Sequence, residues 1–230
     1  MSKYLIIGAS SGIGQSLANH LVSEGHQVIG TYNSNKIEDS ENLSYHHLDV
    51  TADFNIDFIS DQLDGLAYCP GSINLKPFKR ISDEAFLDDF NLQVLGAIKI
   101  IRAALPSLSK SDDASIVLFS TVAVQSGFNF HSQVSVSKGA IEGLTRSLAA
   151  EFAPKVRVNA IAPSLTDTPL ASKLLNTDQK KEANAHRHPL KRIGTPDDIA
   201  HAASFLLSSK SSWITGEIMH VDGGMSSLKM

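Results

Sequence analysis

The sequence predicts an α/β fold, in which a doubly wound parallel sheet lies between two layers of helices in a three-layer αβα arrangement. Short apolar runs of strand length alternate along the chain with longer segments whose apolar residues recur at helical spacing. The chain has 230 residues, a length that favours one large domain over two small ones. Since no repeat, low-complexity tract or linker interrupts the alternation, we expect residues 1–230 to form a single domain.

The first half of the chain opens with a strand, a glycine-rich turn and a helix. An apolar run at residues 4–7 ends at Gly8, and residues 16–22 show helical spacing. The other elements expected in this half are strands at residues 28–32, 43–48 and 65–69, a short helix within residues 53–62 and a long helix from Asp83 to about Leu108.

The second half continues the alternation. Residues 115–120 are typical of a buried strand, and a helical pattern runs from about His131 to Phe152 until Pro154 stops it. The elements expected after it are a strand at residues 156–161, a polar segment of some helical character at 170–191, a helix that Pro196 opens, and a last strand at 217–221.

Charge and apolar content are those of an ordinary globular protein. Lys and Arg total 20 against 24 Asp and Glu, which gives a net charge of −4, and 42% of the residues are apolar. This balance disfavours nucleic acid as a partner. No apolar run approaches the ~18 residues of a membrane span, and the first residues lack the architecture of a signal peptide. We therefore expect a cytoplasmic protein without a membrane partner.

The cysteine and histidine content of the chain disfavours disulfide bonds and metal sites. The single cysteine, Cys69, allows no internal disulfide and no cysteine-based zinc cage, and it suits a reducing compartment. The pairs His46/His47 and His186/His188 have no Asp, Glu or Cys at regular spacing to complete a ligand set. The sequence therefore predicts no metal site.

A glycine-rich loop lies between the first predicted strand and the first helix. It has the pattern G-x-x-x-G-x-G and consists of Gly8, Ala9, Ser10, Ser11, Gly12, Ile13 and Gly14. Glycines permit a tight turn and close backbone approach, so that a pyrophosphate can bind the N–H groups at the helix N-terminus. A turn without a ligand is the alternative, but the strand–loop–helix context favours a dinucleotide site in a Rossmann-type domain.

The end of the second strand bears on which dinucleotide binds. A site for NAD carries an Asp or Glu about 20 residues after the loop, to bind the ribose hydroxyls. This chain has Tyr32 there, and the side chains of Thr31, Asn33, Ser34 and Lys36 can all donate hydrogen bonds without repelling a phosphate. The segment has no arginine to clamp the 2′-phosphate, so NAD(H) stays open, but NADP(H) is favoured.

Motifs spread along the chain resemble the short-chain dehydrogenase/reductase family. They are the glycine loop, Asp49-Val50, Pro70-Gly71, residues 134–138, 159–163, 168–169, 188–196, 214–216 and 221–224. The resemblance runs from about residue 4 to 224 and implies a nicotinamide cofactor, hydride transfer and a homo-oligomer, commonly a tetramer. It also implies cofactor contacts from three segments: Asp49 and Val50 at the adenine, Pro70, Gly71 and Ser72 at the ribose, and Pro163, Ser164, Thr166 and Thr168 at the nicotinamide.

The chain departs from the family in the catalytic tetrad of Asn, Ser, Tyr and Lys. Lys138 is retained, but the tyrosine position four residues earlier holds Val134. The serine position holds Thr121, with Ser120 beside it, and the asparagine position falls on Gln93, although Asn91 lies two residues earlier. Because valine has no ionisable proton, a carbonyl reduction needs another acid or a water within reach.

His131 is a candidate for that acid. It lies seven residues before Lys138, on nearly the same helix face as Val134. This spacing is similar to that of enoyl-acyl-carrier-protein reductases, whose tyrosine stands seven residues before the lysine. Histidine commonly changes charge near neutral pH. A histidine that merely faces solvent or a subunit boundary is the alternative.

By the same resemblance, residues 170–191 form a mobile lid over the substrate. This segment is the most basic part of the chain, because it contains Lys173, Lys180, Lys181, His186, Arg187 and His188. It would attract a small anionic or acyl-carrier-linked substrate, unless the charges are simply solvated.

Two functions follow from these observations. The first is an oxidoreductase that transfers hydride to or from a C=O or activated C=C bond. In it Lys138 holds the ribose, Thr121 or Ser120 contacts the substrate oxygen, and His131 or a water supplies the proton. The second is a catalytically silent NADP(H)-binding regulator or structural subunit, in which loss of the tyrosine at position 134 abolished turnover.

Overall fold

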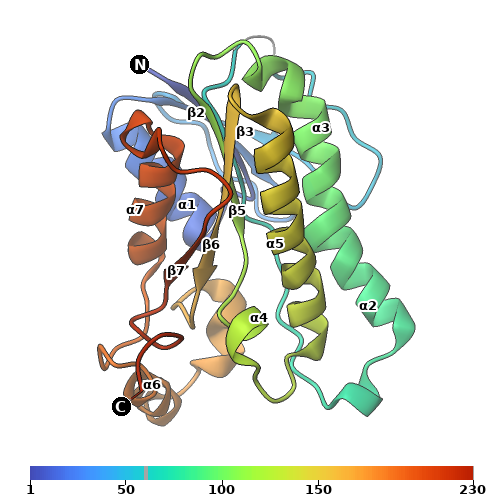
Figure 1. Ribbon diagram of the computed structural model, residues 1–230, viewed down its shortest axis with the longest axis vertical. Coiled ribbons are helices and arrows are strands. Elements are labelled where there is room, and N and C mark those ends of the chain that lie inside the picture. The colour runs from blue at the N-terminus through green and yellow to red at the C-terminus, as the bar shows by residue number, and fades with distance from the viewer. Residues whose placement is uncertain (60–61, 230) are drawn as a thin grey trace.

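A computed structural model describes residues 1–59 and 62–229, which form a parallel sheet covered by helices on both faces (Figure 1). The sheet has seven strands in the order β3-β2-β1-β4-β5-β6-β7, and every pairing is parallel. The doubly wound fold expected from the sequence is confirmed. The strands are β1 (Lys3–Ile7), β2 (Gln27–Tyr32), β3 (Leu43–His47), β4 (Gly65–Tyr68), β5 (Ala114–Phe119), β6 (Val156–Pro163) and β7 (Ile218–Val221).

The helices divide between the two faces of the sheet. On one face α1 (Gly12–Ser23) packs beside α7 (Pro196–Leu207). The other face carries α2 (Asp83–Phe90), α3 (Gly96–Leu108) and α5 (Ser132–Phe152) (Figure 1). Two shorter helices, α4 (Ala123–Ser126) and α6 (Asp178–His186), follow the carboxyl ends of β5 and β6.

Alternate residues of β1 pack into the two helical layers on opposite faces of the sheet. Leu5 and Ile7 are fully buried in the cluster with the α3 and α5 side chains, whereas Tyr4 and Ile6 are buried among those of α1 and α7. Successive strand residues point to opposite faces of a sheet. A strand that is buried on both faces therefore has a continuous run of apolar residues in its sequence, and residues 4–7 form such a run.

Two predicted elements differ from the structure. The long helix expected from Asp83 to Leu108 is interrupted by a π-helical turn, Asn91–Leu95, of the kind often found at functional sites. The short helix expected within residues 53–62 is wrong for residues 53–59 and 62, which are not helical, while residues 60 and 61 lie outside the described part. There the side chain of Asn55 accepts from the N–H of Asp57 at 3.5 Å, a local bond that competes with helix formation.

The topology places a crevice at the carboxyl ends of β1 and β4. The chain leaves β1 for β2 on one side and continues from β4 to β5 on the other, so that the loops after these two strands diverge. Ligands of doubly wound folds bind at such a switch point. The glycine loop follows β1 here, and residues 69–72 follow β4. Over the described residues, no helix is long and apolar enough to cross a bilayer.

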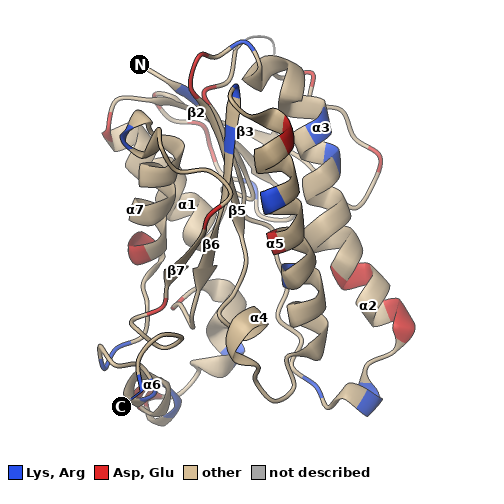
Figure 2. Cartoon of the chain, viewed as in Figure 1, with Lys and Arg blue, Asp and Glu red and all other residues tan. Residues whose placement is uncertain are grey.

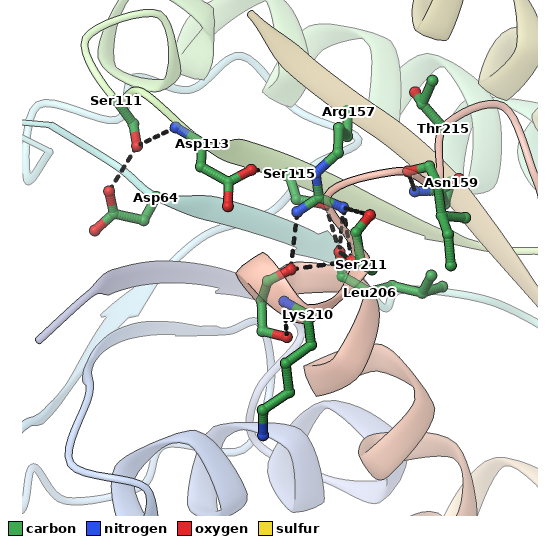
Figure 3. A network of polar contacts seen from close by, with 12 residues as sticks. Asp64, Ser111, Asp113, Ser115, Arg157, Asn159, Leu206, Lys210, Ser211 and Thr215 are labelled. Carbon is green, nitrogen blue, oxygen red and sulfur yellow. Dashed lines mark hydrogen bonds and ion pairs between the residues drawn. The ribbon is translucent and has the colours of Figure 1, made fainter.

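A buried arginine at the opposite end of the sheet ties β6 to the end of α7 (Figure 3). The guanidinium of Arg157 donates to the carbonyls of Leu206 and Ser208, both at 3.0 Å, and to the hydroxyl of Ser211 at 2.7 Å. It also pairs with Asp113 at 3.2 Å. A cation at a helix C-terminus is favourable, and its N–H groups bond carbonyl groups that have no partner within the helix.

Replacing Arg157 by alanine is expected to destabilise the domain by about 3 kcal/mol, because it removes the hydrogen bonds of a buried charged donor and its ion pair with Asp113. Urea unfolding followed by circular dichroism measures the change. The exposed Arg102 of α3 is the matched control, and its alanine variant is expected to lie within about 0.5 kcal/mol of the wild type. Equal losses in the two variants would refute this role for Arg157.

Candidate active site and dinucleotide groove

The glycine loop closes tightly against the start of α1. Gly12 has a φ of +54°, in the left-handed region that favours glycine. A Cβ on Gly14 would lie 2.2 Å from the carbonyl oxygen of Gly8, so no larger residue fits there. Ser11 at the N-cap makes no side-chain capping bond, and the first turn carries no acidic residue. The first N–H groups of α1 therefore suit an anion.

A groove of about 350 Å³ runs along this loop. The hydroxyl of Thr31, at the end of β2, accepts from the N–H of Gly8 at 3.0 Å and so fixes the loop to the sheet. The groove brings together most of the predicted cofactor residues, namely Gly8, Ser10, Ser11, Gly12, Ile13, Gly14, Thr31, Tyr32, Asn33, Ser34, Val50, Pro70, Gly71 and Thr168.

Some predicted cofactor residues lie elsewhere. Asp49 is not part of the groove wall. Its carboxylate instead accepts from the hydroxyl and N–H of Thr51, and these bonds lower the pKa of Asp49. The others line an adjoining pocket: Ser72, Pro163, Ser164 and Thr166. Among the described residues that line the groove, none is acidic.

The adjoining pocket has a volume of about 460 Å³ and meets the groove end to end. Both share Ile13, Cys69, Gly71, Thr168 and Leu170 as lining residues. The pocket brings together all the residues expected at the catalytic positions, namely Gln93, Ser120, Thr121, His131, Val134 and Lys138. A ligand that spans groove and pocket would reach these side chains.

The two hydroxyls after β5 have different partners. Ser120 is buried and donates to a carboxylate oxygen of Glu142 in α5 at 2.8 Å. The hydroxyl of Thr121 accepts from the N–H of Ala123 at 3.3 Å, which leaves its own proton to donate. Thr121 is therefore the better placed to bond a substrate oxygen.

Burial sets the protonation of two side chains where groove and pocket meet. It lowers the pKa of Lys138 to about 8, against the opposing effect of the Asp89 carboxylate. Burial also raises the pKa of the Cys69 thiol to about 12, so the thiol is neutral at neutral pH. Lys138 thus supplies a cation where the groove opens into the pocket, and Cys69 does not act as a nucleophile there.

Sequence reasoning missed a buried carboxylate behind the pocket wall. Asp89 of α2 is 5% exposed. Both of its oxygens accept from the amide of Gln93 at 2.8 Å, and it also accepts from Ser137 at 2.6 Å and from Ser72. The amide oxygen of Gln93, although buried, has no partner within the described structure. The spacing of Asp89 and Gln93, one helical turn, was the only signal in the sequence.

His131 stands at the N-cap of α5 and lines the pocket. Its Nδ1 lies 2.7 Å from the carbonyl oxygen of Asn129. Because a carbonyl only accepts, Nδ1 carries the proton of this bond. The other ring nitrogen, Nε2, is then left for a second partner.

Residues of the segment 170–191 line part of the pocket, and the role of this segment as a mobile lid stays a prediction. The guanidinium of Arg187 lies 5.5 Å from the ring centre of Phe128. His188 is buried, with Nδ1 2.8 Å from the carbonyl oxygen of Asn184 and Nε2 2.8 Å from the Ser164 hydroxyl. Lys180 also lines the pocket, and basic residues cluster around α6 (Figure 2). The side of the pocket formed by residues 170–191 is therefore positively charged, whereas the rest of the pocket wall is largely apolar.

Fold and site together define a Rossmann-type dinucleotide-binding protein with a reaction pocket at the end of its groove. A family model described as enoyl-(acyl carrier protein) reductase matches residues 8–226. The uncharacterized oxidoreductase YmfI of Bacillus subtilis is 30% identical, over 96% of this chain and 97% of that protein. 3-Oxoacyl-[acyl-carrier-protein] reductase FabG of Vibrio harveyi is 31% identical over 96% of each. The chain belongs to the short-chain dehydrogenase/reductase family of oxidoreductases.

Solved structures agree with this assignment. Ligand-free aldohexose dehydrogenase (AldT) of Thermoplasma acidophilum superposes with a TM-score of 0.89 at 30% identity, covering 100% of this chain and 96% of that one. The NADP-bound protein ElxO superposes with a TM-score of 0.86 at 26% identity, covering 99% and 100%.

Proposed function

We propose that this protein is an NADP(H)-preferring reductase that transfers hydride to or from a C=O or activated C=C bond and uses a proton donor other than tyrosine. The observation that carries the proposal is the continuity of groove and pocket, which share Gly71 and Cys69 beside Lys138. The tight glycine loop and the uncapped start of α1 fit a pyrophosphate. NADP-bound ElxO is similar in fold.

The preference for NADP(H) over NAD(H) rests on the chemistry at the end of β2. The groove there is lined by Tyr32, Asn33, Ser34 and Asn35, whose side chains all carry donors. A carboxylate at this place would bind two ribose hydroxyls and repel a 2′-phosphate. With none among the described lining residues, the groove accepts the added phosphate.

The roles of the chain's own residues follow from their positions. A bound NADPH supplies the hydride. Lys138 and Gln93 would hold hydroxyl groups where the groove opens into the pocket, and Thr121 would donate to the substrate oxygen. Protonated His131 would give the proton from Nε2, since the carbonyl of Asn129 keeps Nδ1–H. Val134, in the same wall, has no proton to give.

The pocket favours a substrate with an apolar body and an anionic end. Its interior includes Ile73, Leu75 and Val134, while Lys180 and Arg187 lie on its lid side. A small carboxylate or an acyl-carrier-linked thioester has this character, and 3-oxoacyl-carrier-protein reductases are among the relatives. We further propose a cytoplasmic homo-oligomer that has no nucleic acid or membrane partner.

Oxidation of NADPH, followed at 340 nm with a panel of carbonyls and enoyl thioesters, tests this function. The expected result is turnover that favours anionic or thioester substrates over neutral ones of equal length. Val134 motivates the second candidate, a silent NADP(H)-binding regulator or structural subunit. Tight NADPH binding without turnover on any substrate would favour that candidate over the reductase.

A further inference from the structure

The buried carboxylate of Asp89 gathers side chains from three separate segments. Ser72 follows β4, Gln93 lies in the π-helical turn and Ser137 is in α5, and each donates to it. Asp89 lies in an acid-rich helix whose other carboxylates are exposed (Figure 2). A carboxylate stays buried only when hydrogen bonds or charges compensate it. This one is compensated beside the reaction pocket.

The network fixes the orientation of the Gln93 amide. A carboxylate only accepts, so the NH₂ group of Gln93 must face Asp89 and its oxygen must face away. A Cβ on Gly71 would lie 3.4 Å from that amide oxygen and 3.8 Å from the Lys138 ammonium. The two atoms therefore border one small space, where Gly71 lines both groove and pocket.

This space suits a hydroxyl group, because a hydroxyl can donate to the amide oxygen of Gln93 and accept from the ammonium of Lys138. Gln93 is 1% exposed and its amide oxygen has no partner in the described structure. A buried acceptor without a partner destabilises the folded state. A ligand hydroxyl at this place would remove that destabilisation.

Asp89 also stands out among the titratable groups around Lys138. Cys69, at the end of β4, is a neutral thiol. Glu142, one turn along α5, bonds Ser120 and Arg146, and His131 lies two turns earlier at the start of the helix. Burial lowers the pKa of Lys138, and Asp89 has the larger effect of the two neighbours, ahead of Cys69, that oppose this change.

We propose that Asp89 is a positioning residue. It turns the amide oxygen of Gln93 toward Gly71, so that this oxygen and the ammonium of Lys138 together hold one hydroxyl of the ligand. The inference rests on the proposed function, in which that ligand is the dinucleotide or its co-substrate. Asp89 itself touches neither, because it lies behind Gln93 and Ser137.

Replacing Asp89 by asparagine tests the effect on Lys138 without any cofactor. The rate of acetylation of Lys138 by acetic anhydride, read by peptide mass spectrometry, gives the pH midpoint at which the amine loses its proton. We expect this midpoint to fall by about one pH unit in D89N, because a nearby anion favours the charged amine. Exposed Lys99 of α3 is the internal reference, and exposed Asp88, the preceding residue, gives the matched control D88N.

The ligand half of the inference is tested by NADPH titration of the same proteins at pH 6.5 and pH 8. D89N is expected to bind more weakly than D88N, with the larger loss at pH 8. NADPH affinity in D89N equal to that in D88N, or an unchanged Lys138 midpoint in D89N, overturns the inference. If thermal melting shows that D89N is unfolded, D89S, which leaves room for a water, replaces it. Failure of the wild type to bind NADPH contradicts the proposed function, and the midpoint then still decides the claim about Asp89.

Discussion

Replacing Lys138 by methionine is expected to weaken NADPH binding about 10- to 100-fold, because a charge-assisted hydrogen bond contributes about 1.5–3 kcal/mol. Methionine keeps most of the length of the side chain and removes only the donor and the charge. Burial lowers the pKa of Lys138 to about 8. Wild-type affinity should therefore fall as the pH rises through 8, and the affinity of K138M should not.

Calorimetric titration of both proteins with NADPH from pH 6.5 to 9.5 measures this effect. K99M, which changes an exposed lysine on α3, is the control and should match the wild type at every pH. If K138M bound NADPH as tightly as the wild type, Lys138 would have no role in holding the dinucleotide.

Replacing His131 by alanine is expected to lower the turnover number by about 10²–10⁴-fold, the usual contribution of a general acid. NADPH affinity should stay unchanged, since His131 does not border the space at Gly71 where groove and pocket meet, as Lys138 does. Steady-state rates of the two proteins at saturating NADPH give the comparison.

A second substitution in the H131A variant shows whether the loss of rate comes from the missing proton donor or from disturbed packing of the pocket. Val134 lies in the pocket wall, one turn before Lys138. V134Y would place a phenol next to the ammonium and is expected to recover much of the lost rate. H201A, which changes an exposed histidine of α7, is the control. Equal turnover by wild type and H131A would remove His131 as the proton donor.

Local patterns were enough to predict the groove. A glycine loop is contiguous in sequence, so its contact with the start of α1 follows from the strand and helix on either side. The resemblance to the family likewise predicted Gln93, Thr121 and Lys138 as neighbours, and the structure places all three in the wall of one pocket.

The Asp89 network could not be predicted in this way. Asp88 and Asp89 are adjacent identical residues, and only the phase of α2 as it enters the π-helical turn decides which of them is buried. Ser72 and Ser137 reach Asp89 from distant segments. The short helix expected within residues 53–62 rested on a weak helical pattern, and residues 53–59 are not helical in the structure.

Titration of the purified protein with NADPH and with NADH is the decisive measurement, because the proposed chemistry needs the dinucleotide in the groove. We expect NADPH to bind with micromolar affinity and more tightly than NADH, which lacks the phosphate that Asn33 and Ser34 can bond. Binding of neither dinucleotide, or a preference for NADH, would refute the proposed function.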